Sequence, residues 1–405
     1  MLKYIYTSEE YSCISREDEN IMKLKFGLLA RIVTAIVLAA LLGTFVPEWF
    51  VRIFATFNGL FGNFLNFVVP LIIIGFIAPG IAQLGKGSGK LLGLATFFAY
   101  FSTIVAGMLA YFVAANVLPN FISSNQLDGA SNPNDFLAKA FFEVGMPPLM
   151  DVMSALILAF ILGVGMTVVK GDVMKRGFDE LNAIVEKLIS YIIIPLLPFH
   201  IFGIFLNMTF AGQVVKILSV FAVVFALIFI LHWVMLVFQY SVAGALNKKN
   251  PFMLLKLMLP AYFTAIGTQS SAATIPVTLR QAKQTGATDK VTDFTVPLFA
   301  TIHLSGSTIT IVTCTIGVML MNGMEFTLAT MFGFIMMLGI TMVAAPGVPG
   351  GGVMAAIGLL GTMLGFDETM IALMIALYMA QDSFGTATNV TGDGALAMIV
   401  DKFSK

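Results

Sequence analysis

Ten long stretches of this chain carry almost no charged side chains, and they limit what the chain can fold into. A stretch of about 20 apolar residues is long enough to cross a lipid bilayer as a helix. Because 58% of the 405 residues are hydrophobic and 11% are charged, the sequence predicts an all-α polytopic membrane protein. The stretches are Leu28–Val46, Phe54–Gln83, Leu91–Asn116, Val152–Val169, Leu188–Val215, Ile217–Asn247, Leu257–Leu279, Thr295–Met324, Phe326–Phe366 and Met370–Val400.

The positions of Lys and Arg predict how the chain is oriented. With a cytoplasmic N-terminus, only Arg52, Lys139 and Lys216 face outward, and the other nineteen of the 22 Lys and Arg face the cytoplasm, as is usual for membrane proteins. We therefore expect a protein of the cell membrane with both termini in the cytoplasm. The polar residues 1–21 lack the features of a signal peptide and are expected to form a disordered cytoplasmic tail. The net charge of zero gives no indication of a nucleic-acid partner.

Two of the apolar stretches are interrupted at mid-length by small, polar or proline residues, at Gly267–Pro276 and at Ala344–Gly352. Irregular backbone is tolerated at membrane depth only where protein buries it or where it lines a wet cavity. We therefore expect two re-entrant helical hairpins, at about 252–283 and 328–366, that enter from opposite faces. Each is followed by a spanning helix, which is the order of an inverted repeat in secondary transporters. The predicted fold has eight transmembrane helices and two hairpins.

The last apolar stretch contains two carboxylates, Asp382 and Asp393. A charge at bilayer depth costs at least about 2.5 kcal/mol, so such residues face a polar pathway and have a function there. At 100° per residue, Asp382, Thr386, Asn389 and Asp393 fall on one stripe of one helix. That stripe could hold a cation, an ammonium group, or both.

Three motifs, Ser270–Thr278, Val348–Gly352 and Asn389–Asp393, resemble those of the dicarboxylate/amino acid:cation symporter family, which has the glutamate-transporter fold. The resemblance runs from about Met22 to the C-terminus. It implies sodium-coupled transport by alternating access, in a homotrimer surrounded by membrane lipid. It also implies scaffold helices in 22–90 and 149–215, an extracellular loop at 118–148, and a transport domain made of 91–117 and 216–405, with the last helix at about 369–401.

The resemblance also implies roles for individual residues of the substrate site. Asp382 would hold the α-ammonium group of an amino acid, and Asn389 with the hairpin backbone around Ser271 would hold its α-carboxylate. These roles suit a carboxylate and a set of N–H donors. The other residues expected at the substrate are Thr386, Ser270, Gln269, Gly385, Val348 and Gly350.

The same resemblance implies sites for sodium ions, the coupling ions, and no organic cofactor. Asp393 with nearby carbonyl oxygens would bind one ion, with Asn389 beside it, and Thr301 with the tip of the second hairpin would bind another. Tyr100 and Thr103 match a third site. Oxygen ligands of this kind are the ones that hard cations prefer.

Two departures from the family bear on the substrate. Transporters of acidic amino acids have an arginine where this chain has Gly385 or Gln269, and no Lys or Arg lies between Val291 and Val400 to replace it. A buried carboxylate without a cationic partner is costly. We therefore expect a small neutral amino acid such as serine, threonine or alanine. Transport of an acidic amino acid or a dicarboxylate is the alternative.

A third departure bears on coupling. Where the family has Asn-Met-Asp-Gly in its penultimate span, this chain has His303-Leu-Ser-Gly306. The amide and the carboxylate are therefore missing at His303 and Ser305, which weakens the case for a third sodium. Imidazole titrates near neutral pH, so His303 could bring a proton instead. Sodium at Asp393 is the primary expectation, and proton-coupled symport is the alternative.

An intramembrane protease with Asp382 and Asp393 as its catalytic pair is a remote alternative. Such a pair needs carboxylates about 3 Å apart. Eleven residues along one helix separate these two by about 16 Å. We therefore expect a transporter and not an enzyme.

Overall fold

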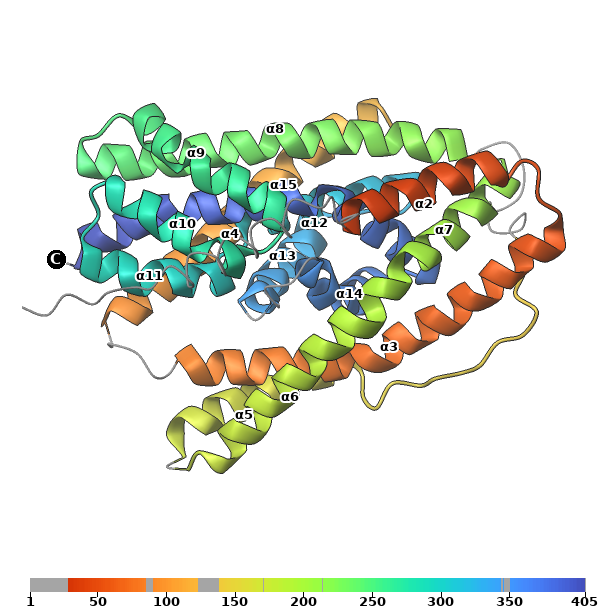
Figure 1. Cartoon of the computed structure of the whole chain (residues 1–405), viewed down its shortest axis with the longest axis horizontal. Coiled ribbons are helices and arrows are strands. Elements are labelled where there is room, and N and C mark those ends of the chain that lie inside the picture. Colours follow the sequence, from red (N-terminus) through yellow and green to blue (C-terminus); the bar gives the residue numbers. More distant parts are fainter. Residues whose placement is uncertain are drawn as a thin grey trace, which may run out of the picture.

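The computed structural model describes residues 28–84, 90–122, 138–169, 171–212, 214–343, 345 and 350–404, and these form helices with no strand among them (Figure 1). The predicted tail and Val348 lie outside the described residues. The elements are α2 (Leu28–Leu42), α3 (Glu48–Leu84), α4 (Lys90–Val117), η1 (Leu118–Asn120), α5 (Val152–Val168), α6 (Val173–Leu188), η3 (Ile189–Ile193), α7 (Ile194–Phe210), α8 (Val214–Asn247), α9 (Pro251–Thr268), α10 (Ser271–Gln284), α11 (Asp289–Ile302), α12 (Ser305–Met321), α13 (Leu328–Met342), α14 (Gly351–Leu364) and α15 (Glu368–Ser404).

Each of the eight predicted spans corresponds to one helix or to consecutive helices. They are α2, α3, α4, α5, α6 with α7, α8, α11 with α12, and α15. Seven helices of the described chain are long and apolar enough to cross a membrane; six of them belong to these units, and the seventh is α9. α2 and α5 are shorter apolar helices. The all-α polytopic class is thus confirmed, and the count of eight spans stays a prediction.

The fifth unit begins earlier than the sequence analysis expected. Its helix starts at Val173 and not near Leu188, and it continues through the π-helical turn η3 into α7. The first part, α6, is amphipathic, with Arg176, Asp179 and Glu180 exposed on one side. A search for charge-free runs cannot find such a helix, because its charged face interrupts the run.

Both interrupted stretches form helical hairpins. α9 packs against α10, and α13 packs against α14. The first pair is joined by Gln269 and Ser270, and the second pair ends its connection at Gly350. Gln269 and Gly350 have the left-handed φ values of 52° and 76°, which let the chain reverse in a short connection. Entry of the hairpins from opposite faces of a bilayer stays a prediction.

α15 runs through the middle of the helical assembly (Figure 1). It packs against α4, α8, α9, α10, α11, α12 and α14, and most of its residues are buried. α12, which lies against α15, and α14 are also mostly buried. Polar side chains on these helices therefore have to find their partners within the protein.

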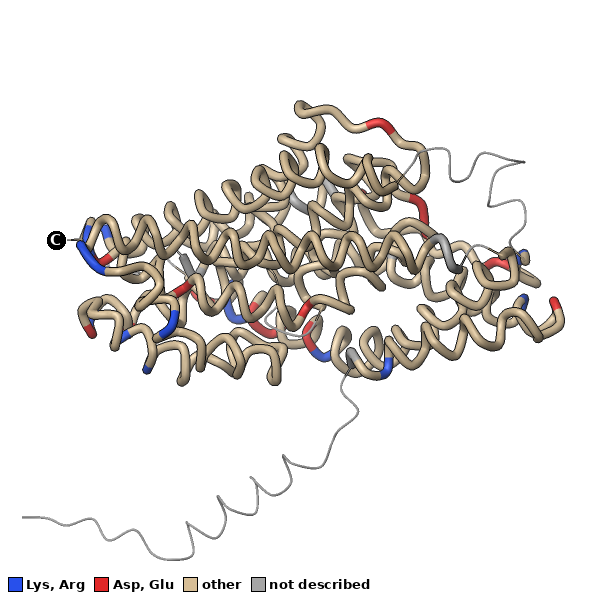
Figure 2. The backbone as a smooth tube through the Cα atoms, turned by 90° about the horizontal axis from the view of Figure 1, so that it is seen from above, with Lys and Arg blue, Asp and Glu red and all other residues tan. Residues whose placement is uncertain are grey.

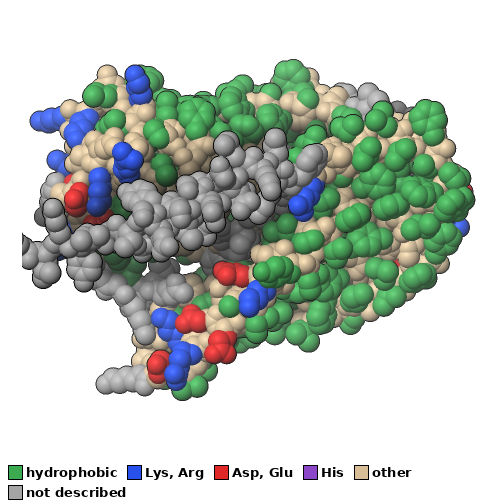
Figure 3. All heavy atoms as spheres, in the orientation of Figure 1, with side chains coloured by type: hydrophobic (Ala, Val, Ile, Leu, Met, Phe, Trp, Pro, Cys, Tyr) green, Lys and Arg blue, Asp and Glu red, His purple; other side chains and the backbone are tan. Residues whose placement is uncertain are grey.

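The outer surface is rich in hydrophobic side chains (Figure 3), and Val37, Ile161 and Phe229 are among those exposed. Lys and Arg lie mostly in the half of the molecule that holds the C-terminus (Figure 2). Arg52 donates a hydrogen bond from Nε to the carbonyl oxygen of Lys139 at 3.1 Å, so these two residues share one end, as the predicted orientation requires. Which end faces the cytoplasm stays a prediction.

Candidate functional site

The four polar residues predicted to share one stripe are buried along α15. Less than one tenth of Asp382, Thr386 and Asn389 is exposed, and Asp393 is fully buried. α15 is an unbroken helix from Glu368 to Ser404, so its regular spacing holds the four side chains in one row. The row therefore lies in the protein interior, where its polar groups need hydrogen-bond partners.

Asp382, Thr386 and Asn389 line a small cavity of about 20 Å³, which has room for roughly one water molecule. The tips of both hairpins and the start of α12 complete its wall. A molecule of several heavy atoms enters only if these elements move apart. The other lining residues are Gln269, Ser271, Ala300, Leu304, Ser307, Ala345, Gly352 and Tyr378.

Three helices begin at this cavity: α10 at Ser271, α12 at Ser305 and α14 at Gly351. The first N–H groups of a helix have no partner within the helix, and this end carries a partial positive charge. Three such ends around one cavity favour an anionic or hydrogen-bond-accepting group there. Side chains of α15 already accept hydrogen bonds from backbone N–H groups at two of these three helix starts.

Asn389 satisfies the start of α12. Its Oδ1 accepts hydrogen bonds from the backbone N–H groups of Gly306 at 2.8 Å and Ser307 at 3.3 Å. Its Nδ2 donates to Oγ of Ser307 at 3.0 Å. The amide oxygen of Asn389 is therefore engaged by the protein, and one N–H of Nδ2 remains for another acceptor such as the predicted substrate carboxylate.

Asp382 satisfies the start of α14. Its Oδ2 accepts a hydrogen bond from the backbone N–H of Gly350 at 2.8 Å, and the hydroxyl of Tyr378 also hydrogen-bonds this carboxylate. Gly350 is at the tip of the second hairpin, so the bond ties that tip to α15. A carboxylate has about four acceptor positions, so Asp382 retains capacity for a further donor.

The start of α10 in the first hairpin is capped by its own side chain. Oγ of Ser270 accepts from the backbone N–H of Ala273 at 3.2 Å, so the predicted ligand Ser270 serves as an N-cap. Among the described residues, no hydrogen bond joins a side chain of α15 to the first turn of α10. Ser271 and Gln269 both line the cavity. N–H groups in the first turns of α10 and α14 therefore remain available to an anionic group at the cavity.

Asp393 lies deeper along α15 and is paired with His303. Oδ1 of Asp393 is 2.8 Å from Nδ1 of His303, and both side chains are buried. Oδ2 of Asp393 has no hydrogen-bond partner among the described residues. His303 lies in the break between α11 and α12, where its φ and ψ of −113° and 97° leave the helical region. The two predicted cation ligands are thus brought together.

The remaining predicted ligands are engaged in other ways. Thr301 is exposed and donates to the carbonyl oxygen of Leu298 at 2.7 Å. The Tyr100 hydroxyl donates to the carbonyl oxygen of Met336 at 3.2 Å, and Thr103 donates to that of Ala99 at 2.9 Å. Gly385 faces α12 and not the cavity, since an added Cβ would lie 3.5 Å from Oγ1 of Thr310.

Four residues of the polar interior were not predicted: Ser102, Gln239, Ser307 and Tyr378. Gln239 contacts Ser102 and His303, while Ser307 and Tyr378 lie at the cavity. Gln239 could have been found, because an amide within the apolar stretch Ile217–Asn247 follows the same logic as an aspartate at membrane depth. Ser102, Ser307 and Tyr378 carry no such signal in sequence.

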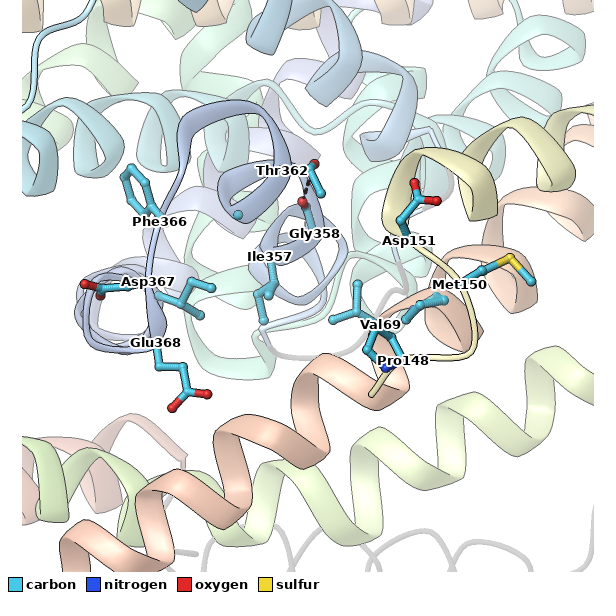
Figure 4. Close-up of a pocket in the computed structure, with 13 residues that line it drawn as sticks. Val69, Pro148, Met150, Asp151, Ile357, Gly358, Thr362, Phe366, Asp367 and Glu368 are labelled. Carbon is cyan, nitrogen blue, oxygen red and sulfur yellow. Dashed lines mark hydrogen bonds between the residues drawn. The ribbon is translucent and has the colours of Figure 1, made fainter. Parts of the chain in front are cut away.

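Two larger cavities lie away from these residues. One of about 490 Å³ is lined by α3, α14, the segment before α5 and the first turn of α15, with Asp151, Asp367 and Glu368 around it (Figure 4). The other, of about 460 Å³, lies between α3, α7 and residues 138–143, and it shares Glu368 with the first. Neither is lined by a residue predicted to bind substrate or sodium. Both are lined by helices predicted as scaffold and by the start of α15, which is predicted as transport domain.

Comparison with known proteins gives one family. The family model described as the sodium:dicarboxylate symporter family matches residues 28–403. A serine/threonine transporter, SstT, of Acinetobacter baylyi is 27% identical, with 94% of this chain and 100% of the relative aligned. Proteins of the same name from Acinetobacter baumannii and Streptococcus thermophilus are 26% and 24% identical, each with 93% of this chain aligned and with 98% and 96% of the relative covered.

The hydrogen bonds at the start of α12 lead to a prediction that can be tested without knowing the ligand. Asn389→Ala removes the acceptor of two buried N–H groups, so we expect a loss of about 1–3 kcal/mol of stability, seen as a lower melting temperature in detergent. Asn389→Asp keeps an acceptor oxygen at the helix N-terminus and should lose less. Equal melting temperatures for Asn389→Ala and the parent would contradict this role.

Proposed function

Because the chain belongs to the sodium:dicarboxylate symporter family, we propose that it is a secondary active transporter that carries a small neutral amino acid into the cell together with sodium. Serine and threonine are the proposed substrates, with alanine as a related one. The names of the relatives support this choice, since each is a serine/threonine transporter.

The observation that carries the proposal is the charge of the cavity wall. Asp382 is the only charged side chain among the described lining residues. A neutral α-amino acid brings one ammonium and one carboxylate group. Asp382 would pair with the ammonium group, and the start of α10 with the free N–H of Asn389 would receive the carboxylate. A second carboxylate, as in aspartate, would be buried without a cation, which is costly.

The hydrogen bond between Asp382 and Gly350 would couple substrate binding to the position of the second hairpin. A bound ammonium group and the N–H of Gly350 would use the same carboxylate, so binding and the position of the second hairpin would affect each other. The small cavity also requires the hairpin tips to part for entry. We propose that the second hairpin is the outer gate and that 91–117 with 216–405 moves against the other helices in a homotrimer.

Sodium would be carried with the amino acid as a second cargo. The fully buried Oδ2 of Asp393 has no donor among the described residues, and a monovalent cation would neutralise it. No three His, Cys, Asp or Glu side chains come together in the described part of the chain, which argues against a transition-metal site there. A sodium ion is the hard cation that such a single carboxylate with carbonyl oxygens suits.

Uptake of labelled L-serine into proteoliposomes tests the proposal. We expect accumulation that depends on an inward sodium gradient at fixed pH. Unlabelled threonine and alanine should compete, and glutamate and aspartate should not. Uptake that ignores sodium and follows a pH gradient would support the proton-coupled alternative, and the 2.8 Å pair of His303 and Asp393 would then be the first residues to change.

Asp382→Asn should reduce serine binding by more than about tenfold, because the substrate ammonium group loses its charged partner. Asparagine still accepts a hydrogen bond from Gly350, so the hairpin contact is retained. The measurement is equilibrium binding of serine at saturating sodium. Asp179→Asn, on the exposed face of α6, is the matched control. An unchanged serine affinity in Asp382→Asn would exclude the ammonium role.

Gln269→Arg tests the neutral-substrate argument at a residue that lines the cavity. It adds a cation at the tip of the first hairpin, so aspartate should become a competitor of serine uptake. This position suits the test better than Gly385, which is packed against α12. Gln269→Met has a side chain of similar length without charge and should not admit aspartate. Failure of aspartate to bind a folded, serine-transporting Gln269→Arg protein would remove the charge argument.

A further inference from the structure

A cluster of buried polar side chains surrounds Asp393, away from the small cavity. Its members come from four parts of the chain: Ser102 from α4, Gln239 from α8, His303 in the break before α12 with Ser305 at the start of α12, and Asp393 from α15. No member has more than one tenth of its surface exposed. Ser102 and Gln239 have no role in the substrate site proposed above.

The hydrogen bonds of the cluster form a directed chain. Nε2 of Gln239 donates to Oγ of Ser102 at 3.0 Å and to Oγ of Ser305 at 3.3 Å. Oγ of Ser102 is 3.1 Å from Nε2 of His303, and Nδ1 of His303 is 2.8 Å from Oδ1 of Asp393. With His303 donating from Nδ1, each group donates to the next and the chain ends on the carboxylate. Hydrogen bonds arranged in this way polarise and strengthen one another.

The residues expected at a third sodium site do not fit an ion in this arrangement. Both ring nitrogens of His303 have partners, and the ring offers no oxygen ligand. Oγ of Ser305 already accepts from Gln239. Tyr100 and Thr103 direct their hydroxyl groups to backbone carbonyls of α13 and α4. A hard cation needs several oxygen ligands at once, and these side chains do not supply them together.

The cluster nevertheless leaves two buried oxygens unsatisfied, and one of them belongs to a carboxylate. Oδ1 of Asp393 is held by His303, whereas Oδ2 of Asp393 and Oε1 of Gln239 have no hydrogen-bond partner among the described residues. No Lys or Arg lies between Val291 and Val400 to neutralise the carboxylate. The Tyr240 hydroxyl, on the neighbouring α8, donates to the carbonyl oxygen of Thr391 and not to this carboxylate. One cation would be enough to neutralise this single anionic oxygen.

Building on the proposed function, we propose that Ser102, Gln239 and His303 take the place of a third sodium ion. They are positioning residues that fix Asp393 through Oδ1 and direct Oδ2 to a single sodium. The transport cycle therefore carries at most two sodium ions with each amino acid. Gln239 and Ser102 thereby affect the affinity of the sodium at Asp393.

Equilibrium accumulation of serine in proteoliposomes measures the number of ions. With a tenfold sodium gradient, equal pH and a membrane potential clamped at zero, two coupled sodium ions give about hundredfold accumulation and three give about thousandfold. We expect no more than the first value. The thousandfold value would overturn this inference and leave the proposed function intact. Accumulation that does not respond to sodium would overturn both.

Sodium-dependent melting of the purified full chain tests the positioning role without transport. An ion that binds only the folded protein raises its melting temperature as its concentration increases. Gln239→Leu removes the head of the hydrogen-bond chain, so the sodium concentration for half of this increase should rise about tenfold. Ser102→Ala is a smaller change that interrupts the next link and should shift it in the same direction.

Ser241→Ala is the matched control, because Ser241 lies on the same helix as Gln239 and is exposed, with its hydroxyl bonded to the carbonyl oxygen of Val237. Its sodium titration should equal that of the parent. A purely structural role for Gln239 would lower the melting temperature at every sodium concentration without moving the midpoint of the titration. An unmoved midpoint in both Gln239→Leu and Ser102→Ala would overturn the inference.

Discussion

Three helices begin inside this largely apolar protein, and the packing of its interior depends on acceptors for the first N–H groups of these helices. α10, α12 and α14 all begin next to the cavity, and their first N–H groups have no acceptor within their own helices. A single unbroken helix, α15, supplies the acceptors for two of them, through Asn389 and Asp382. The third start, at Ser271, is satisfied in part by its own Ser270 cap. The arrangement of acceptors on α15 thus decides where the broken helices are placed and which of them remains open to a ligand.

Much of this fold could be predicted from the sequence, because its strongest constraint is local. Apolar runs predicted the helices, and small or polar interruptions such as Gly267–Pro276 predicted the hairpins. The stripe from Asp382 to Asp393 followed from helical spacing alone. The amphipathic α6 was missed, because its charged face interrupts the hydrophobic run. The hydrogen-bond partners of each polar group could not be predicted from the sequence. Ser102, Gln239 and His303 meet only after three separate helices have packed.

The sizes of the cavities fit a protein whose parts move. The cavity at the proposed substrate site holds roughly one water, whereas the two spaces of about 490 and 460 Å³ lie beside α3, where the proposed scaffold meets the proposed transport domain. A tightly packed interface resists sliding, because interdigitated side chains would have to leave their holes together. Loose packing beside α3 with tight closure around Asp382 is what a carrier needs if it encloses its cargo and then shifts as a unit.

The two carboxylates of α15 have partners of different kinds, and under the proposed function this difference would let one helix serve two cargoes. Asp382 is bonded to the backbone of Gly350 at a hairpin tip, a partner that can withdraw when the tip lifts. Asp393 is bonded to His303, which is buried between α11 and α12 and is itself held by Ser102. Under the proposed function, the first carboxylate would exchange a protein donor for a substrate ammonium group, whereas the second would stay bonded to His303. An amino acid would then control the gate, and a sodium ion would supply the charge that the fixed site lacks.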